Sequence, residues 1–174
     1  TQSRSSAASD VYKRQVYRYI DWLITVPLLM IEFWIILKAV GASVGSGSFV
    51  RLLAGTLVML VFGYLGEAGV MDATLGFWIG MVGWAVIIYE IFAGEAGKAA
   101  AATESVKAAF GYMRLIVLVG WAIYPIGYVM GYMMGGVDEG SLNMVYNLAD
   151  FVNKILFGLI IWNLAYKDSS ESSH

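Results

Sequence analysis

The sequence predicts an all-α fold, a polytopic bundle of transmembrane helices. Hydrophobic residues make up 59% of its 174 positions and charged residues only 14%, whereas a soluble domain has about 25% charged residues. Five apolar segments are long enough to cross a bilayer, since a membrane helix needs about 20 mostly apolar residues. So few charges could not cover a soluble surface, and we therefore expect the outer surface to face lipid.

The five segments are separated by short polar or glycine-rich connections. They run over about residues 16–40, 49–66, 74–93, 106–134 and 141–167. The connections are a Gly/Ser loop at 41–48, a polar turn at 67–73, a charged Ala-rich stretch at 94–105 and a turn at 135–140. We expect one helical membrane domain over residues 16–167.

The two terminal segments do not fit the membrane pattern. Residues 1–15 are polar and Ser-rich and have no apolar stretch of the kind found in a signal peptide. We interpret them as a disordered tail or an artefact. Residues 168–174 form a short polar tail after the last apolar segment.

Basic and acidic residues divide between the two sets of helix ends. One set carries Lys38, Arg51, Lys98, Lys107, Arg114 and Lys167, and the other carries Glu67, Asp72, Asp138 and Glu139. Loops rich in Lys and Arg stay on the cytoplasmic side of a membrane. We therefore expect a multi-pass protein of the cell (inner) membrane whose first helix enters from outside and whose C-terminus is cytoplasmic.

Composition excludes several kinds of chemistry and partner. The chain has no cysteine, which excludes disulfides and thiol chemistry, and its one histidine is the final residue, His174. We therefore expect no metal site built on His or Cys ligands. A net charge of −2 argues against nucleic acid as a partner. Carboxylates, lysine, arginine, tyrosine or a bound cofactor must carry the function.

Two ionisable residues lie well inside the last apolar segment. Asp150 and Lys154 are four residues apart, so they share one face of a helix. A charge at mid-membrane costs about 2.5–3.5 kcal/mol on insertion scales. Such residues persist where they pair with each other or have a function. The spacing alone is consistent with either a buried structural ion pair or an active site.

The first apolar segment carries a stripe of polar side chains. Asp21, Thr25 and Glu32 fall at i, i+4 and i+11, on one helix face. At 1.5 Å per residue, the two carboxylates are about 16 Å apart along the axis. They could serve a proton path, one on each side of a central group, or Glu32 could simply pair with a neighbouring helix. Arg18 lies one turn outward of Asp21 and could keep it ionised.

Aromatic residues occur near these charges in four of the segments. Trp22 follows Asp21 in the first segment. The others are Phe77 and Trp84 in the third segment, Trp121 and Tyr124 beside Pro125 in the fourth, and Tyr146 in the fifth. Aromatic stripes are usually packing. Here they accompany a lysine, which could form a Schiff base with an aldehyde.

Three runs of residues together resemble the microbial rhodopsins, most closely the proteorhodopsins. Residues 18–32, RYIDWLITVPLLMIE, resemble their third helix; residues 121–125, WAIYP, the sixth-helix floor of the retinal pocket; and residues 146–154, YNLADFVNK, the seventh helix. The resemblance covers about residues 16–167. It implies five helices of a seven-helix rhodopsin fold, without counterparts of the first two helices or of the histidine in the second.

The resemblance implies a role for each charged residue of the pattern. Lys154 would bind all-trans retinal as a protonated Schiff base. Asp21 would be its primary counterion and proton acceptor, Asp150 the second counterion, and Arg18 would tune that cluster. Glu32 would return a proton to the Schiff base from the cytoplasmic side. The retinal pocket would be lined by Trp22, Leu29, Phe77, Gly80, Trp84, Trp121, Tyr124, Pro125 and Tyr146.

Within the resembled family, two positions distinguish activities and colours. Chloride pumps lack the acceptor carboxylate, sodium pumps carry an Asn/Asp/Gln set, and sensors often lack the donor carboxylate. The Asp21, Thr25 and Glu32 triplet therefore implies a light-driven outward proton pump, a transporter and not an enzyme. Leu29 occupies the colour-tuning position, where leucine accompanies green absorption.

The resemblance also implies partners and leaves alternatives open. The expected partners are membrane lipid and further copies of the chain in a homo-oligomer, a pentamer or a hexamer. A sensory rhodopsin that signals to a transducer and a fragment of a pump that does not function alone remain alternatives. So does a membrane protein without retinal, in which Lys154 and Asp150 form a structural pair.

Overall fold

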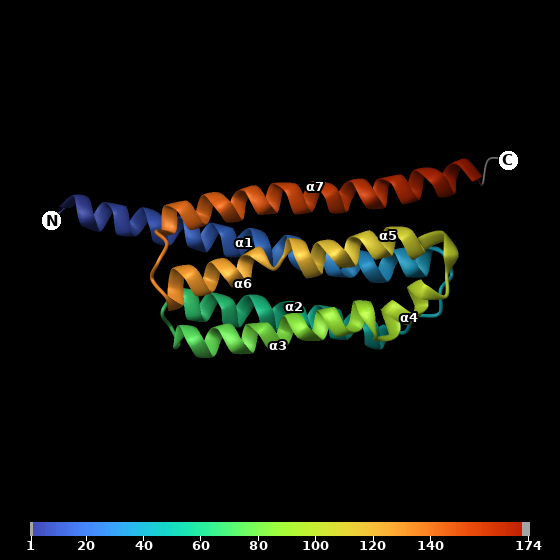
Figure 1. Ribbon diagram of the computed structural model, residues 1–174, viewed down its shortest axis with the longest axis horizontal. Coiled ribbons are helices and arrows are strands. Elements are labelled where there is room, and N and C mark those ends of the chain that lie inside the picture. The colour runs from blue at the N-terminus through green and yellow to red at the C-terminus, as the bar shows by residue number, and fades with distance from the viewer. Residues whose placement is uncertain (1, 172–174) are drawn as a thin grey trace.

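The computed structural model describes residues 2–171, without the side chains of residues 2–12, 14, 168 and 171. Its elements, in chain order, are α1 (Gln2–Ala39), α2 (Ser46–Glu67), α3 (Ala73–Phe92), α4 (Glu95–Ala101), α5 (Glu104–Leu115), η1 (Ile116–Gly120), α6 (Ile123–Tyr128), η2 (Val129–Met133) and α7 (Glu139–Glu171). The long helices run alongside one another in a bundle (Figure 1). Over the described range every regular element is helical, which confirms the all-α prediction.

Five helical stretches are long and apolar enough to cross a membrane. They are Gln15–Ala39, Ser46–Glu67, Ala73–Ala101, Glu104–Met133 and Glu139–Lys167. The five predicted spans are thereby confirmed. The connection predicted over 94–105 is largely helical, because α4 continues the third span after a short break. Alanine, which fills much of that stretch, has the highest intrinsic helix propensity.

The first helix begins well before the first predicted span. The structure continues α1 back to Gln2, and residues 1–15 contain no Gly or Pro that would end a helix. Gln15 is buried, and its amide donates a hydrogen bond to Glu67 at 3.3 Å. At the other end α7 extends to Glu171, so the short tail predicted from residue 168 also begins as helix.

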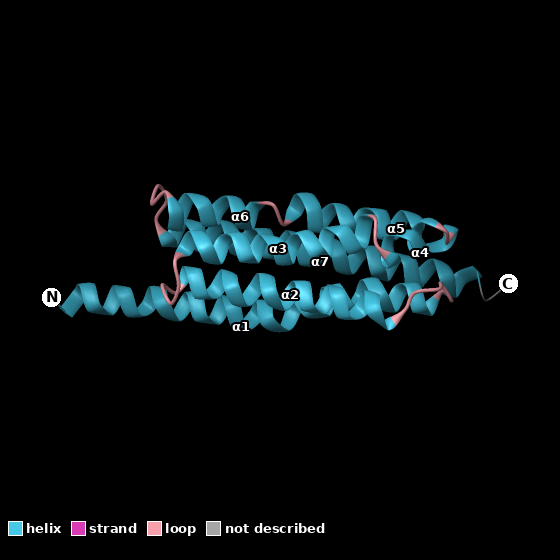
Figure 2. Cartoon of the chain, turned by 90° about the horizontal axis from the view of Figure 1, so that it is seen from below, coloured by secondary structure: helices cyan, strands magenta, loops and turns pink. Residues whose placement is uncertain are grey.

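Glycines bring α2 and α3 into close contact. A Cβ atom built on Gly83 would lie 2.5 Å from the backbone oxygen of Gly55, and one on Gly76 would lie 2.8 Å from that of Phe62. Small residues of this kind let membrane helices approach without a side chain between them. The two helices lie side by side in both ribbon views (Figures 1 and 2). Together they form one wall of the bundle.

The fourth predicted span is interrupted. It consists of α5, the π-helical turn η1, a turn at Trp121–Ala122, α6 and the π-helical turn η2, and Figure 2 shows the break between its two halves. Pro125 lacks the N–H that an unbroken helix would need at that position. Insertions of π-helix and prolines are the usual causes of such kinks.

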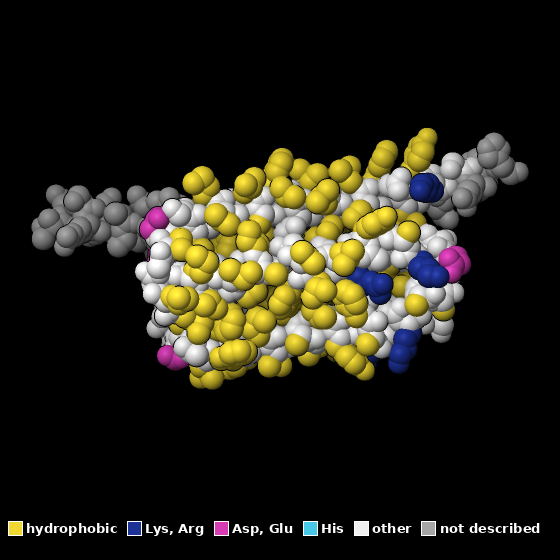
Figure 3. Space-filling view, in the orientation of Figure 1, with side chains coloured by type: hydrophobic (Ala, Val, Ile, Leu, Met, Phe, Trp, Pro, Cys, Tyr) yellow, Lys and Arg dark blue, Asp and Glu magenta, His cyan; other side chains and the backbone are white. Residues whose placement is uncertain are grey.

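The outer surface is apolar over the middle of the bundle. Ile24, Trp78, Val82, Phe151 and Trp162 each expose at least 60% of their surface. Figure 3 shows apolar side chains across the middle of one face and Lys and Arg side chains toward one end. Such a surface requires lipid around it, and the protein is therefore a multi-pass membrane protein.

Candidate functional site

The site is centred on Lys154, which α7 directs into the bundle. Its Nζ donates a hydrogen bond to Oδ2 of Asp21 on α1 at 2.5 Å and lies 3.8 Å from Oδ2 of Asp150, one turn earlier on α7. The side chain of Lys154 is 27% exposed and that of Asp150 16% exposed. One cation thus lies between two carboxylates from different helices, as both the structural and the functional interpretation require.

Aromatic donors fix the position of Asp150. Trp22 Nε1 donates to Oδ2 of Asp150 at 2.8 Å, and the Tyr124 hydroxyl donates to Oδ1 at 2.5 Å. Both carboxylate oxygens therefore accept a hydrogen bond. Because Trp22 belongs to α1 and Tyr124 to α6, the same bonds hold α7 between those helices.

Asp21 is held less firmly than Asp150. Within the described residues, Lys154 is the hydrogen-bond donor to its carboxylate, and the side chain is 47% exposed. Thr25 donates from Oγ1 to the backbone oxygen of Asp21 at 2.9 Å. Thr25 therefore steadies the helix turn, whereas the carboxylate itself depends on Lys154.

Arg18 is directed away from the central carboxylates. Its guanidinium forms an ion pair with Glu67 at 2.6 Å and a hydrogen bond with Asn143. In the part of the chain that the structure describes, no ion pair joins Arg18 to Asp21. The guanidinium also lies 4.9 Å from the centre of the Tyr146 ring. The ion-pair partner of Arg18 is thus the buried carboxylate that α2 supplies, and its predicted influence on the charge of Asp21 stays a prediction.

Glu67 is a site residue that the sequence did not predict. It ends α2, and its side chain is only 2% exposed. Beside the Arg18 ion pair it accepts hydrogen bonds from the Tyr19 hydroxyl at 2.9 Å and from Gln15. The sequence places it at the start of a polar turn. Its only signal was a carboxylate directly after an apolar run, which also describes an ordinary exposed helix end.

Glu32 lies about three turns along α1 from Asp21 and is half-buried. Among the described residues, no hydrogen-bond or ion-pair partner contacts its carboxyl group, so the alternative in which it pairs with a neighbouring helix is not seen. The rings of Phe33 and Phe110 are 5.0 Å apart and those of Phe33 and Phe157 5.4 Å apart, both edge to face. These three buried rings join α1, α5 and α7, and Phe33 directly follows Glu32 in the sequence.

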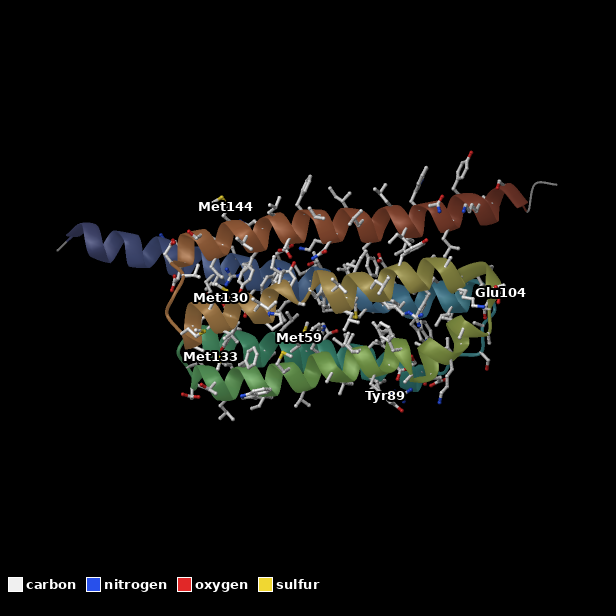
Figure 4. All side chains as sticks on the ribbon, in the orientation of Figure 1. Met59, Tyr89, Glu104, Met130, Met133 and Met144 are labelled. Atoms are coloured by element: carbon white, nitrogen blue, oxygen red, sulfur yellow. The ribbon has the colours of Figure 1, made fainter. Side chains whose placement is uncertain are left out.

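All nine residues predicted to line a pocket do line one cavity, together with Lys154 and Asp150. They are Trp22, Leu29, Phe77, Gly80, Trp84, Trp121, Tyr124, Pro125 and Tyr146. The sequence did not single out Val26, Met59, Leu60, Gly63, Gly76, Met81, Tyr128 and Asn153, which also line it. Figure 4 shows Met59 pointing from α2 into the bundle, whereas Met144 points outward from α7.

The cavity has the chemistry of a site for an apolar ligand. Its lining is mostly apolar and aromatic, with a few polar groups, as in most sites for small organic ligands. Trp22 packs edge to face against Tyr124 and Tyr146, with ring centres 5.2 and 5.9 Å away. An amine at one end of an aromatic cavity can form an imine with a carbonyl compound.

Comparisons with known proteins agree with this site. A family model described as bacteriorhodopsin-like protein matches residues 3–168. The chain is 58% identical over 162 residues to the green-light absorbing proteorhodopsin of Gamma-proteobacterium EBAC31A08, covering 90% of this chain and 64% of that protein. It is 57% identical over 161 residues to the blue-light absorbing proteorhodopsin of Gamma-proteobacterium Hot 75m4, covering 90% and 63%.

A solved structure shares the fold. The crystal structure of the blue light-absorbing proteorhodopsin from Med12 matches with a TM-score of 0.73 and 49% sequence identity, over 88% of this chain and 68% of that one. The chain spans slightly less than two thirds of the length of the two curated relatives.

Proposed function

Because the chain belongs to the bacteriorhodopsin-like family, we propose that it works in light-driven outward proton transport with retinal attached to Lys154. Rhodopsins of this family carry retinal and are not enzymes. The observation that carries the proposal is the position of Lys154 Nζ, 2.5 Å from Asp21 and 3.8 Å from Asp150, inside an aromatic cavity.

The residues of the cavity fit retinal. When bound, retinal would supply visible-light absorption and a positive charge on the Lys154 nitrogen. The direction of the N–H bond at that nitrogen would change when the retinal isomerises. Trp84 and Trp121 line the cavity, and Gly80, which has no side chain, leaves room against α2, where a Cβ atom would lie 3.3 Å from the Met59 backbone oxygen. Asp21 and Asp150 balance a positive nitrogen that would otherwise be costly within a membrane.

Asp21 is the proton acceptor in this proposal, at its Oδ2 atom. It is the carboxylate nearest to Lys154, and it has no second donor in the described structure to hold its charge. Asp150 is the fixed partner in this proposal, because Trp22 and Tyr124 both donate to it. Two carboxylates in unlike surroundings can divide the roles of acceptor and fixed anion.

Glu32 is the proton donor in this proposal and acts from the other side of Lys154. A half-buried carboxyl group that has no ion-pair partner among the described residues is suited to hold its proton until a stronger base appears. Lys38 and Lys167, at the same end of the bundle as Glu32, support a cytoplasmic position for that end and for the C-terminus.

Two further features of the proposal rest on the resemblance. We propose green absorption because Leu29 occupies the colour-tuning position and lines the cavity; the two curated relatives, one green-absorbing and one blue-absorbing, are nearly equally similar. We also propose that the chain assembles into a pentamer or hexamer in the membrane.

Retinal binding tests the first half of the proposal. The purified chain in lipid nanodiscs is mixed with all-trans retinal, and we expect a visible absorption band that borohydride bleaches. Lys154→Ala should abolish the band, whereas Lys107→Ala, at an exposed surface pair, should leave it unchanged. A band of equal strength in Lys154→Ala would refute the assignment of Lys154.

Proton movement tests the second half. In chain loaded with retinal, Glu32→Gln should slow the return of the proton to the Lys154 nitrogen after a flash by about 10²-fold, the usual contribution of a positioned acid. Glu104→Gln, which changes an exposed carboxylate, is the matched control. Equal recovery rates in both variants would remove Glu32 from the proposal. A slow cycle in which illuminated liposomes show no proton transport would favour the sensory alternative.

A further inference from the structure

The break in the fourth span frees two backbone oxygens. The N–H of Trp121 bonds to the oxygen of Ile116 at 3.0 Å, and the N–H of Tyr124 bonds to the oxygen of Trp121 at 3.1 Å. In a regular α-helix, Trp121 would donate to Val117 and Tyr124 to Gly120. The change of register therefore removes the normal partner of the oxygens of Val117 and Gly120.

Side chains of two other helices bond to these two oxygens. Trp84 Nε1 of α3 donates to the oxygen of Val117 at 3.2 Å, and Asn153 Nδ2 of α7 donates to that of Gly120 at 3.1 Å. A buried carbonyl without a partner is costly, so these bonds stabilise the broken form of the span. The break is thereby tied to the helices on both of its sides.

Asn153 is placed to connect the break with the site. It is 91% buried, lines the cavity and directly precedes Lys154 in α7. Its partner Gly120 has no room for a side chain, because a Cβ atom there would lie 2.4 Å from Oδ1 of Asn153. The backbone of α7 at the lysine and the joint between η1 and α6 are therefore separated by a single side chain.

From this geometry we propose that Asn153 is a positioning residue that couples the backbone at Lys154 to the angle between α5 and α6. While the Asn153 amide donates its hydrogen bond to the Gly120 oxygen, the angle between α5 and α6 is fixed. A displacement of α7 at Lys154 loosens that bond and lets α5 move. The light-driven part rests on the proposed function, but the fixed angle in the dark does not.

The absence of cysteine makes the angle measurable by spin labels. One label replaces Tyr112 on α5 and another Tyr89 on α3, positions that are 60% and 61% exposed. Double electron–electron resonance on the full chain in nanodiscs, without retinal, then gives the distance distribution across the break. A second pair, Val50 on α2 with Tyr89, does not cross the break and serves as the control pair.

Four variants separate the hydrogen bond from simple packing. Asn153→Leu keeps the volume but removes the donor, and Asn153→Ala removes both. We expect both to raise the population of a second α5 position roughly fivefold, the factor that one neutral hydrogen bond represents. Gly120→Ala should do the same by displacing the amide. Adding Gly120→Ala to Asn153→Ala should cause no further change, since the methyl group then meets no amide oxygen.

Each outcome decides a part of the proposal. If Asn153→Leu gives the wild-type distribution, the amide is not the link and the proposal is refuted. Equal broadening of the control pair would show general loosening and would also refute it. With retinal bound, light should shift the Tyr112–Tyr89 distance in wild type and add little in Asn153→Leu. A retinal-loaded wild type with no light-induced shift would overturn the coupling, whereas failure to bind retinal would concern the proposed function alone.

Discussion

Glu67→Gln should destabilise the folded chain far more than the same substitution at a surface carboxylate. Glu67 and Arg18 have side-chain exposures of 2% and 4%, and their ion pair measures 2.6 Å. Removing one partner of a buried pair leaves the other charge uncompensated, which costs about 3–5 kcal/mol. Tyr19 and Gln15 also donate to the Glu67 carboxylate, and a glutamine side chain offers them only one oxygen.

The matched control for this prediction is Glu104→Gln. Glu104 pairs with Lys107 at 2.7 Å, but its side chain is 83% exposed. Solvent screening makes such surface pairs worth about 0.2–1 kcal/mol. Both variants are unfolded in mixed micelles by raising the fraction of a denaturing detergent, and the loss of helix is followed by circular dichroism. Equal unfolding midpoints would refute the conclusion that burial makes the loss of one partner of the Arg18–Glu67 pair costly.

A double variant separates charge burial from the general importance of this region. Replacing both partners, as in Arg18→Met with Glu67→Leu, removes the uncompensated charge, and such replacements are often neutral or stabilising. We expect the double variant to recover most of the stability that Glu67→Gln loses. A double variant as unstable as the single one would mean that packing, and not charge, explains the loss.

Two further predictions concern other parts of the fold. Gly83→Ala should separate α2 from α3 and cost about 1–3 kcal/mol of folding stability, because its Cβ atom would lie 2.5 Å from the Gly55 oxygen. Gly158→Ala, in open space on α7, should instead stabilise the fold by about 0.5–1 kcal/mol. Equal melting temperatures of the two variants would contradict this prediction. The bonds from Ser141 lower the pKa of Asp138, so their contribution to stability is present above the pKa of the unfolded chain and is lost as pH falls through the lowered pKa. We therefore expect the start of α7 to fray in acid, which hydrogen exchange of its backbone amides would detect, and Asp138→Asn should remove this dependence on pH. The same pH dependence of exchange in the variant and the wild type would argue against the prediction.

Hydropathy and residue spacing predict much of this structure. The apolar runs are nearly as long as the spans themselves, so four of the five have ends within about three residues of those predicted. Lys154 and Asp150 share a face because four residues make about one helical turn. The residues that line the cavity could be predicted because three runs resemble a known family. Basic residues at one set of helix ends and acidic residues at the other set also supported the predicted ends of the spans.

Contacts between helices could not be predicted in the same way. Arg18 is three residues from Asp21 and 49 from Glu67, and the sequence favours the local partner. Only the packing of α1 against α2 shows that the distant carboxylate is the one that binds it. The break near Gly120 is a similar case. Pro125 indicates that the span is disturbed, but the oxygen that is freed and the side chain that reaches it depend on α7.

The two sides of Lys154 differ in a way that supports one direction of proton movement. Toward the N-terminal half of α1, Arg18 and Glu67 form a buried charged cluster that can stabilise or receive charge. Toward the other half, Phe33, Phe110 and Phe157 are fully buried and offer no polar group. Under the proposed function, a proton that leaves Lys154 would meet charged groups on one side and an apolar region on the other. The proposed return of a proton from Glu32 would need this apolar region to open, and the α5–α6 break lies in the span that carries Phe110.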